Sequence, residues 1–163
     1  MASSTVAHRE PHASTRGAPR VAQSRDVDGQ GPILAGVDGT PSGEVAVKTA
    51  IAWSKRLDAS VVFVYVRRPP MSALGEPFYG RRVEAETLTA RRALAPALEA
   101  AEAAGVSASA EIVDGSPAQR LVELAQRRQA RMLITGPRTR RRHRSVPRGV
   151  LHHTDRPVLV AAA

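Results

Sequence analysis

ILAGVDGTPSG, at residues 33–43, carries in immediate succession the signals of a buried strand, a tight turn and a helix start. Its apolar beginning predicts a strand over residues 33–37, and the Asp-Gly step that follows predicts a turn. Thr40 offers a hydroxyl for an N-cap, and Pro41 is tolerated at the first helical position. Apolar residues then recur at helical spacing, which predicts an amphipathic helix over residues 42–57.

The same alternation of apolar strands and amphipathic helices continues along the rest of the chain. Further strands are predicted at residues 61–66, 107–113, 132–135 and 157–161, and further helices at 81–104, around Leu121, Val122 and Ala125, and at 145–153. Short apolar strands separated by helices predict an α/β protein whose parallel sheet is covered on both faces. Right-handed crossovers then limit the topology to a few doubly wound orders. In such sheets, ligands bind beyond the carboxyl ends of the strands, where the strand order reverses.

The composition is that of one soluble domain with a tail. The chain has 163 residues, no cysteine and a formal charge of +9. Residues 1–30 are rich in Ser, Thr, Ala, Arg, Gly and Pro, with isolated apolar residues, which predicts a disordered N-terminal tail. Residues 31–163 have the length of one domain with a real core. The lack of cysteine suits a reducing compartment, and no apolar run approaches the roughly 18 residues of a membrane span. We therefore expect a cytoplasmic protein without membrane contact.

The positive charge is concentrated in one segment. Nine arginines and no acidic residue lie between Leu124 and Thr154. Such a segment, centred on the arginine-rich loop 138–148, attracts nucleic acid or another polyanion, and that binding should weaken steeply as salt rises. A solvated loop without a ligand is the open alternative. The candidate polyanion-binding side chains are Arg138, Arg140, Arg141, Arg142 and Arg144.

Motifs of the common catalytic classes are missing from the sequence. It contains no Walker glycine-lysine loop, no G-x-G-x-x-G after a strand and no G-x-S-x-G. His143, His152 and His153 cluster, but no second set of ligands has metal spacing, so no metal site is expected. No nucleophile, base and orienting acid are arranged as a triad. We therefore expect no enzymatic turnover.

Four segments carry a family resemblance through their wording, order and spacing. They are ILAGVDGTPSG, VDGSPAQRLVELAQ, ARMLITGPR and SVPRGVLHHTDRPVLVA. Together they resemble the universal stress protein family. The resemblance implies a five-stranded sheet in the order 3-2-1-4-5, of the adenine nucleotide alpha hydrolase-like type, with a switch point between the first and fourth strands. It also implies a homodimer that pairs through the last strand, Val158 to Ala161, an edge strand with an apolar face.

Some members of this family bind ATP at the switch point, and others do not. By resemblance, Asp38 would lie beside the ribose and phosphates, and Val66 beside the adenine. Gly136 would be the first glycine of the loop that follows the fourth strand. Ser145 and Val146 would meet the phosphates at the N-terminus of the last helix.

The loop after Gly136 departs from the pattern of the ATP-binding members. Their loop reads Gly, two residues, Gly, nine residues, Gly, then Ser or Thr. Here the middle glycine is missing, and only eight residues separate Gly136 from Ser145. Arginine and threonine side chains obstruct the close approach of phosphates to the main chain. We therefore expect a regulatory or protective domain with a degenerate nucleotide site and no firmly bound cofactor. ATP binding in the switch-point crevice is the less favoured alternative.

Overall fold

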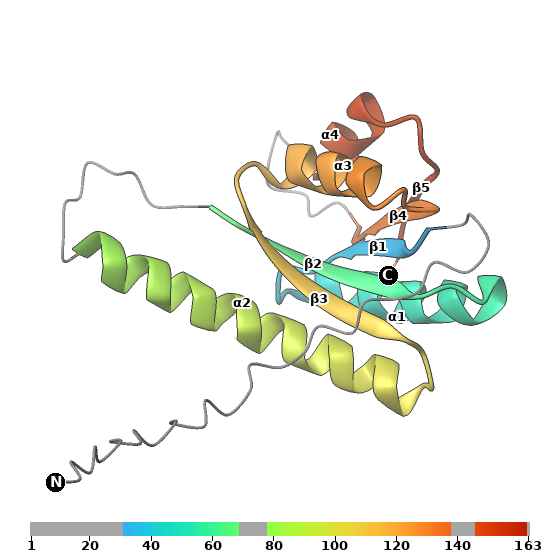
Figure 1. Cartoon of the computed structure of the whole chain (residues 1–163), viewed down its shortest axis with the longest axis horizontal. Helices are drawn as coiled ribbons and strands as arrows, with labels where there is room; N and C mark the ends of the chain where they lie inside the picture. Colours follow the sequence, from blue (N-terminus) through green and yellow to red (C-terminus); the bar gives the residue numbers. More distant parts are fainter. Residues whose placement is uncertain (1–30, 69–77, 138–145, 163) are drawn as a thin grey trace, which may run out of the picture.

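The computed structural model describes residues 31–68, 78–137 and 146–162. The expectations for the tail of residues 1–30 and for the loop 138–145, which includes Ser145 and the candidate arginines, lie outside these residues. Strands and helices alternate along the described chain (Figure 1). The elements are β1 (Ile33–Gly36), α1 (Pro41–Leu57), β2 (Val61–Arg67), α2 (Phe78–Ala103), β3 (Ala108–Asp114), α3 (Pro117–Arg127), β4 (Met132–Thr135), α4 (Val146–His153) and β5 (Val158–Val160).

The strands form one parallel sheet in the order β3-β2-β1-β4-β5, which confirms the predicted topology. At the start of β1, Ile33 lies opposite Val61 of β2 and opposite Met132 of β4. The chain proceeds outward from β1 to β2 and β3, and then returns to the other side of β1 as β4. The carboxyl ends of β1 and β4 therefore form the switch point, where the two flanking connections diverge.

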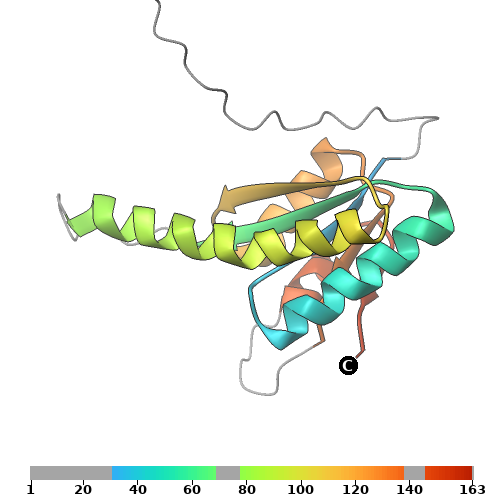
Figure 2. The ribbon, with the colours of Figure 1, turned by 90° about the horizontal axis from the view of Figure 1, so that it is seen from below.

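Helices cover both faces of the sheet, α1 and α2 on one side and α3 and α4 on the other (Figures 1 and 2). Because successive side chains of a strand point to opposite faces, Ile33 and Ala35 pack in the core under α1 and α2. Leu34 packs in the opposite core, under α3 and α4. A fully buried side chain of the size of Ile33 or Leu34 stabilises the fold by about 1.5–3 kcal/mol. The two cores together hold the carboxyl ends of the strands in a fixed register.

The start of α1 follows the sequence prediction. Thr40 is the N-cap, its backbone is extended, and its hydroxyl accepts a hydrogen bond from the N–H of Gly43 at 3.4 Å. Pro41 is the first helical residue. A backbone N–H at this position has no partner within the helix, so the missing N–H of proline costs no helical hydrogen bond. The cap at Thr40 fixes where the N-terminus of α1 meets the end of β1. The helix ends at Leu57, and its C-cap is Asp58, whose φ of 46° lies in the left-handed region.

The boundaries of several elements differ from the sequence prediction by one to three residues. α2 begins at Phe78 rather than at residue 81, and a proline precedes it in the sequence, as is common at a helix start. α4 begins at Val146, and β5 spans only Val158–Val160. Pairing nevertheless continues past β5, because the N–H of Ala161 donates to the carbonyl of Thr135 at 2.8 Å. Among the described helices, none combines the length and the apolar character that a membrane crossing requires.

Candidate functional site

A cavity of about 440 Å³ opens at the switch point. Its floor is made by residues at the carboxyl ends of the three central strands, and its walls by the N-terminal turns of α1, α3 and α4. Its size lies within the range of about 300–1,000 Å³ that is typical of small-molecule sites. Four of the residues assigned from the resemblance line this one cavity, namely Asp38, Val66, Gly136 and Val146. Ser145, the fifth, lies outside the described residues.

Gly36 lies on the floor of this cavity. It lies opposite Val64 in the sheet, and its neighbour Ala35 lies opposite Ile134, so Thr135 follows beside Gly36. A Cβ atom on Gly36 would lie 3.3 Å from a methyl carbon of Leu121, the α3 residue above it. The absence of a side chain at this point therefore lets Leu121 pack directly against the strand.

Asp38 lies at the exposed rim of the cavity, and local hydrogen bonds fix its orientation. Its Oδ1 accepts from the backbone N–H of Thr40 at 3.0 Å and from the hydroxyl of Thr40 at 2.6 Å. Gly43 leaves room for this carboxylate, since a Cβ there would lie 2.6 Å from the same Oδ1. The turn thus presents a carboxylate that is held by its own backbone and able to accept from a ligand through its second oxygen.

Gly136 is required by chain packing in this structure. A Cβ on Gly136 would lie 2.2 Å from the carbonyl oxygen of Ser42 in the first turn of α1. The hydroxyl of Ser42 also donates to the carbonyl of Pro137 at 3.4 Å. The glycine therefore lets the end of β4 pass directly against α1. Pro137, which follows it, has no N–H to offer to a phosphate.

Two further residues of the cavity were missed by the sequence reasoning. Thr135 ends β4 with only 3% of its surface exposed, and its hydroxyl has no hydrogen-bond partner in the described part of the chain. The only sequence signal was a hydroxyl residue that closes an apolar strand. Arg68 brings a positive charge to the exposed rim, directly after β2. Nothing in the sequence pattern singled out this arginine as a site residue.

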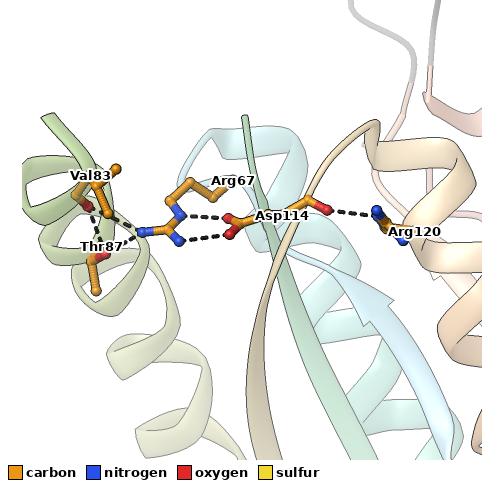
Figure 3. A network of polar contacts seen from close by, with 5 residues as sticks. All are labelled: Arg67, Val83, Thr87, Asp114 and Arg120. Atoms are coloured by element: carbon orange, nitrogen blue, oxygen red, sulfur yellow. Dashed lines mark hydrogen bonds and ion pairs between the residues drawn. The ribbon is translucent and has the colours of Figure 1, made fainter. Parts of the chain in front are cut away.

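A polar network fixes the ends of β2 and β3 beside the cavity (Figure 3). The guanidinium of Arg67 makes two bonds to the carboxylate of Asp114, at 2.6 and 2.8 Å. The same guanidinium donates to the hydroxyl of Thr87 at 2.5 Å and to the carbonyl of Val83 at 3.2 Å, both on α2. Arg120 of α3 donates to the carbonyl of Asp114 at 2.7 Å. The turn at Asp114 and Gly115 is thus tied to its neighbours on both sides.

Arg67 also controls the ionisation of its partner. Its hydrogen bond to the carboxylate is the main reason why the pKa of Asp114 lies below its ordinary value. A carboxylate that is held in this way serves to join strands and helix. We therefore treat Asp114 as a structural residue beside the cavity. Among the described residues, no three His, Asp or Glu side chains gather in a manner suited to a metal ion.

The fold and the cavity define a class: a doubly wound α/β protein with a small-molecule crevice at its topological switch point. The model of the universal stress protein family matches residues 31–162. The chain therefore belongs to the universal stress protein family. No significant match was found among curated proteins.

Solved structures agree with this assignment. A universal stress protein family member from Burkholderia pseudomallei is 26% identical, covers 84% of this chain and 99% of its own, and superposes with a TM-score of 0.69. The universal stress protein from Archaeoglobus fulgidus, solved in complex with dAMP, is 19% identical over 80% of this chain and 97% of its own, with a TM-score of 0.64. A family protein from Arabidopsis thaliana with AMP bound is 16% identical over 80% and 90%, with a TM-score of 0.58. The last two likenesses concern the fold.

Proposed function

We propose that this protein is a regulatory domain that binds an adenine mononucleotide in the switch-point crevice and does not turn it over. The observation that carries the proposal is the cavity of about 440 Å³ lined by Asp38, Val66 and Gly36. Its floor and walls belong to strands and to the N-terminal turns of helices, so the cavity is largely formed before a ligand arrives. The AMP and dAMP complexes of the Arabidopsis and Archaeoglobus proteins, which share the fold, support the choice of ligand.

The preference for a monophosphate follows from the loop after β4. A triphosphate needs several main-chain N–H groups at close approach. Gly136 is packed against Ser42, and the next residue is a proline without an N–H. The shortened loop lacks the middle glycine of the ATP-binding pattern. We infer that the nucleotide site is degenerate in this sense: the described strands and helices supply a nucleoside half, whereas the sequence of the loop lacks the glycines that a triphosphate half requires.

The absence of turnover rests on the ionisable groups at the site. Among the described residues that line the cavity, only Asp38 and Arg68 carry a charge at neutral pH. Asp38 is held by Thr40, and an arginine does not give up its proton in proteins. The hydroxyl that Asp38 accepts from belongs to Thr40, whose oxygen caps α1 by accepting from the N–H of Gly43, so we assign this pair to the turn and not to nucleophilic attack. A binding role that changes with nucleotide concentration fits these groups better than catalysis.

Calorimetric titration of the full chain with AMP, and separately with ATP and magnesium, tests this proposal. We expect AMP to bind, ATP to bind no more tightly, and Asp38→Ala to weaken AMP binding about tenfold, through loss of one charge-assisted hydrogen bond. Asp155→Ala is the matched control, because Asp155 is exposed, does not line the cavity and precedes the edge strand β5. No heat with AMP at millimolar concentration, tenfold tighter binding of ATP, or release of ADP from ATP would each refute the proposal.

We also propose that two copies pair through β5. This strand bonds to β4 along one side, which leaves its other side available to a twofold partner. Val160 is 38% exposed on this strand, and Leu151 of the adjacent α4 is 55% exposed. An apolar surface at a sheet edge favours an isologous contact. A cytoplasmic location, suggested by the cysteine-free composition, is part of the same proposal.

A further inference from the structure

We propose that the hydroxyl of Thr135 is a specificity-determining group of the crevice, and that it hydrogen-bonds the nucleoside part of the bound nucleotide. The inference rests on the nucleotide binding proposed above and adds to it the polar atom that the ligand must bury. It concerns a residue that no sequence motif singled out.

The first observation is that this hydroxyl is buried without a partner. Thr135 is 3% exposed, and its Oγ1 makes no hydrogen bond within the described part of the chain. Its main-chain carbonyl, in contrast, accepts from Ala161 at 2.8 Å. The hydroxyls of the other described threonines all take part in hydrogen bonds: Thr40, Thr49, Thr87, Thr89 and Thr154. A buried polar atom that lacks a partner is unfavourable in the free protein, and a ligand that supplies the partner removes the cost.

The second observation is where Thr135 lies. Its side chain is on the sheet face that α3 and α4 cover, because it is two residues beyond Leu133, which packs in that core. It lines the cavity together with Gly36 and Leu121, and its Oγ1 has almost no exposed surface in the free protein. A ligand that reaches the floor of the cavity meets this hydroxyl once the side chains that cover it shift.

The surroundings decide which part of the ligand this is. Val64 and Leu121 make the inner part of the cavity apolar, and a phosphate would lose its hydration there at a high cost. The charged groups of the site, Asp38 and Arg68, are both exposed at the rim. A neutral hydroxyl donates and accepts, so it suits a ring nitrogen or a ribose oxygen. The nucleoside therefore enters first, and the phosphate stays at the rim.

Thr135→Val tests the inference, since valine has nearly the same shape and lacks the hydroxyl. We expect the affinity for AMP and for adenosine, both measured by calorimetry, to fall by the same factor of about ten, equivalent to about 1.4 kcal/mol. We also expect the melting temperature of the free protein to rise by about 3 °C, because a buried polar atom without a partner has been removed. Thr135→Ser should restore most of the affinity. Thr49→Val, which removes a hydroxyl bonded to Val45 within α1, should change neither affinity.

The outcomes separate this inference from the proposed function. If the wild type binds AMP and Thr135→Val binds it equally well, the inference is wrong and the proposed function stands. A loss for AMP without a loss for adenosine would assign the hydroxyl to the phosphate and overturn the inference. A lower melting temperature for Thr135→Val would mean that the hydroxyl is already paired in the free protein, which also overturns it. If the wild type binds neither ligand, the proposed function fails and the inference fails with it.

Discussion

Gly136→Ala separates two explanations for a glycine at the end of β4. The resemblance to ATP-binding members assigns this glycine to the phosphates, whereas the structure places its missing side chain against α1. A Cβ at this position would lie 2.2 Å from the carbonyl oxygen of Ser42 and 2.6 Å from the carbonyl carbon. Both atoms belong to the main chain, so no rotation of a side chain relieves the contact. The end of β4 and the start of α1 must separate by about 1 Å or more to restore ordinary contact distances of about 3.5 Å.

The magnitude follows from what this separation disturbs. Forcing an extra carbon into a packed site costs about 1–3 kcal/mol, and movement of main chain places this case at the upper end. The separation also disturbs the bond from the hydroxyl of Ser42 to the carbonyl of Pro137. Replacing glycine by alanine returns about 0.4–1 kcal/mol by restricting the unfolded chain. We therefore expect Gly136→Ala to lower the free energy of unfolding by about 2–3 kcal/mol, without any ligand present.

Equilibrium unfolding in urea measures this loss. With a slope of about 2 kcal/mol per molar urea, the midpoint should fall by about 1–1.5 M. Gly36→Ala is a matched control, since its Cβ would meet the methyl carbons of Leu121 at 3.3 and 3.8 Å, on a side chain that can move, and a main-chain atom only at 4.0 Å. Gly105→Ala controls for backbone strain, because φ there is +70° with nothing within 4 Å, and the cost should be about 1 kcal/mol. A midpoint for Gly136→Ala that equals the wild-type value, or lies above that of Gly105→Ala, would refute the packing explanation.

Two further predictions concern the network beside the cavity and the sheet edge. The pKa of Asp114 is lowered by its bond to Arg67, so the stability from this pair is present above the unfolded pKa of about 3.9 and is lost as pH falls through the lower folded value. Wild type should therefore lose more stability than Asp114→Asn between pH 5 and pH 2, by a small amount because Asp114 is 48% exposed, and equal losses in urea titrations would contradict this. Val160→Glu should convert the dimer to a monomer in sedimentation velocity. Leu88→Glu, at a residue of α2 that is 48% exposed, should leave the dimer intact, and a wild type that sediments as a monomer would exclude pairing through β5.

The strand-turn-helix unit at residues 33–43 was predictable because each of its signals is local. The apolar run, the N-cap hydroxyl of Thr40 and the proline at the first helical position act within a few residues of one another, and the structure has them as predicted. Strand order is different in kind. Periodicity limited the sheet to a few doubly wound orders, and the family resemblance supplied 3-2-1-4-5. Long-range order depends on how crossovers pack, which no single segment encodes.

The site was only partly predictable, for the same physical reason. Asp38, Val66, Gly136 and Val146 could be assigned through the family resemblance, and all four line the cavity. Whether the hydroxyl of Thr135 has a partner depends on neighbours from other parts of the chain, such as Leu121. The contact between Gly136 and Ser42 likewise joins residues that are distant in sequence. A pattern along the chain shows a glycine or a threonine, and only the packed sheet shows what the residue meets.

The division of the crevice explains how a family member could lose one half of a nucleotide site and keep the other. Under the proposed function, the nucleoside half consists of Gly36, Val64 and Thr135, which are strand residues. Val64 packs in the core, so stability constrains it, whereas the buried hydroxyl of Thr135 costs stability and is not explained by stability alone. The triphosphate half would depend on the loop after β4, and surface loops in general tolerate deletion. Under the proposed function, loss of glycines from that loop is therefore expected to cost less stability than changes in the strands beneath it. On this reasoning, a change of ligand from ATP to a mononucleotide is the physically accessible route for this domain, and the hydroxyl of Thr135 is where its new specificity would be fixed.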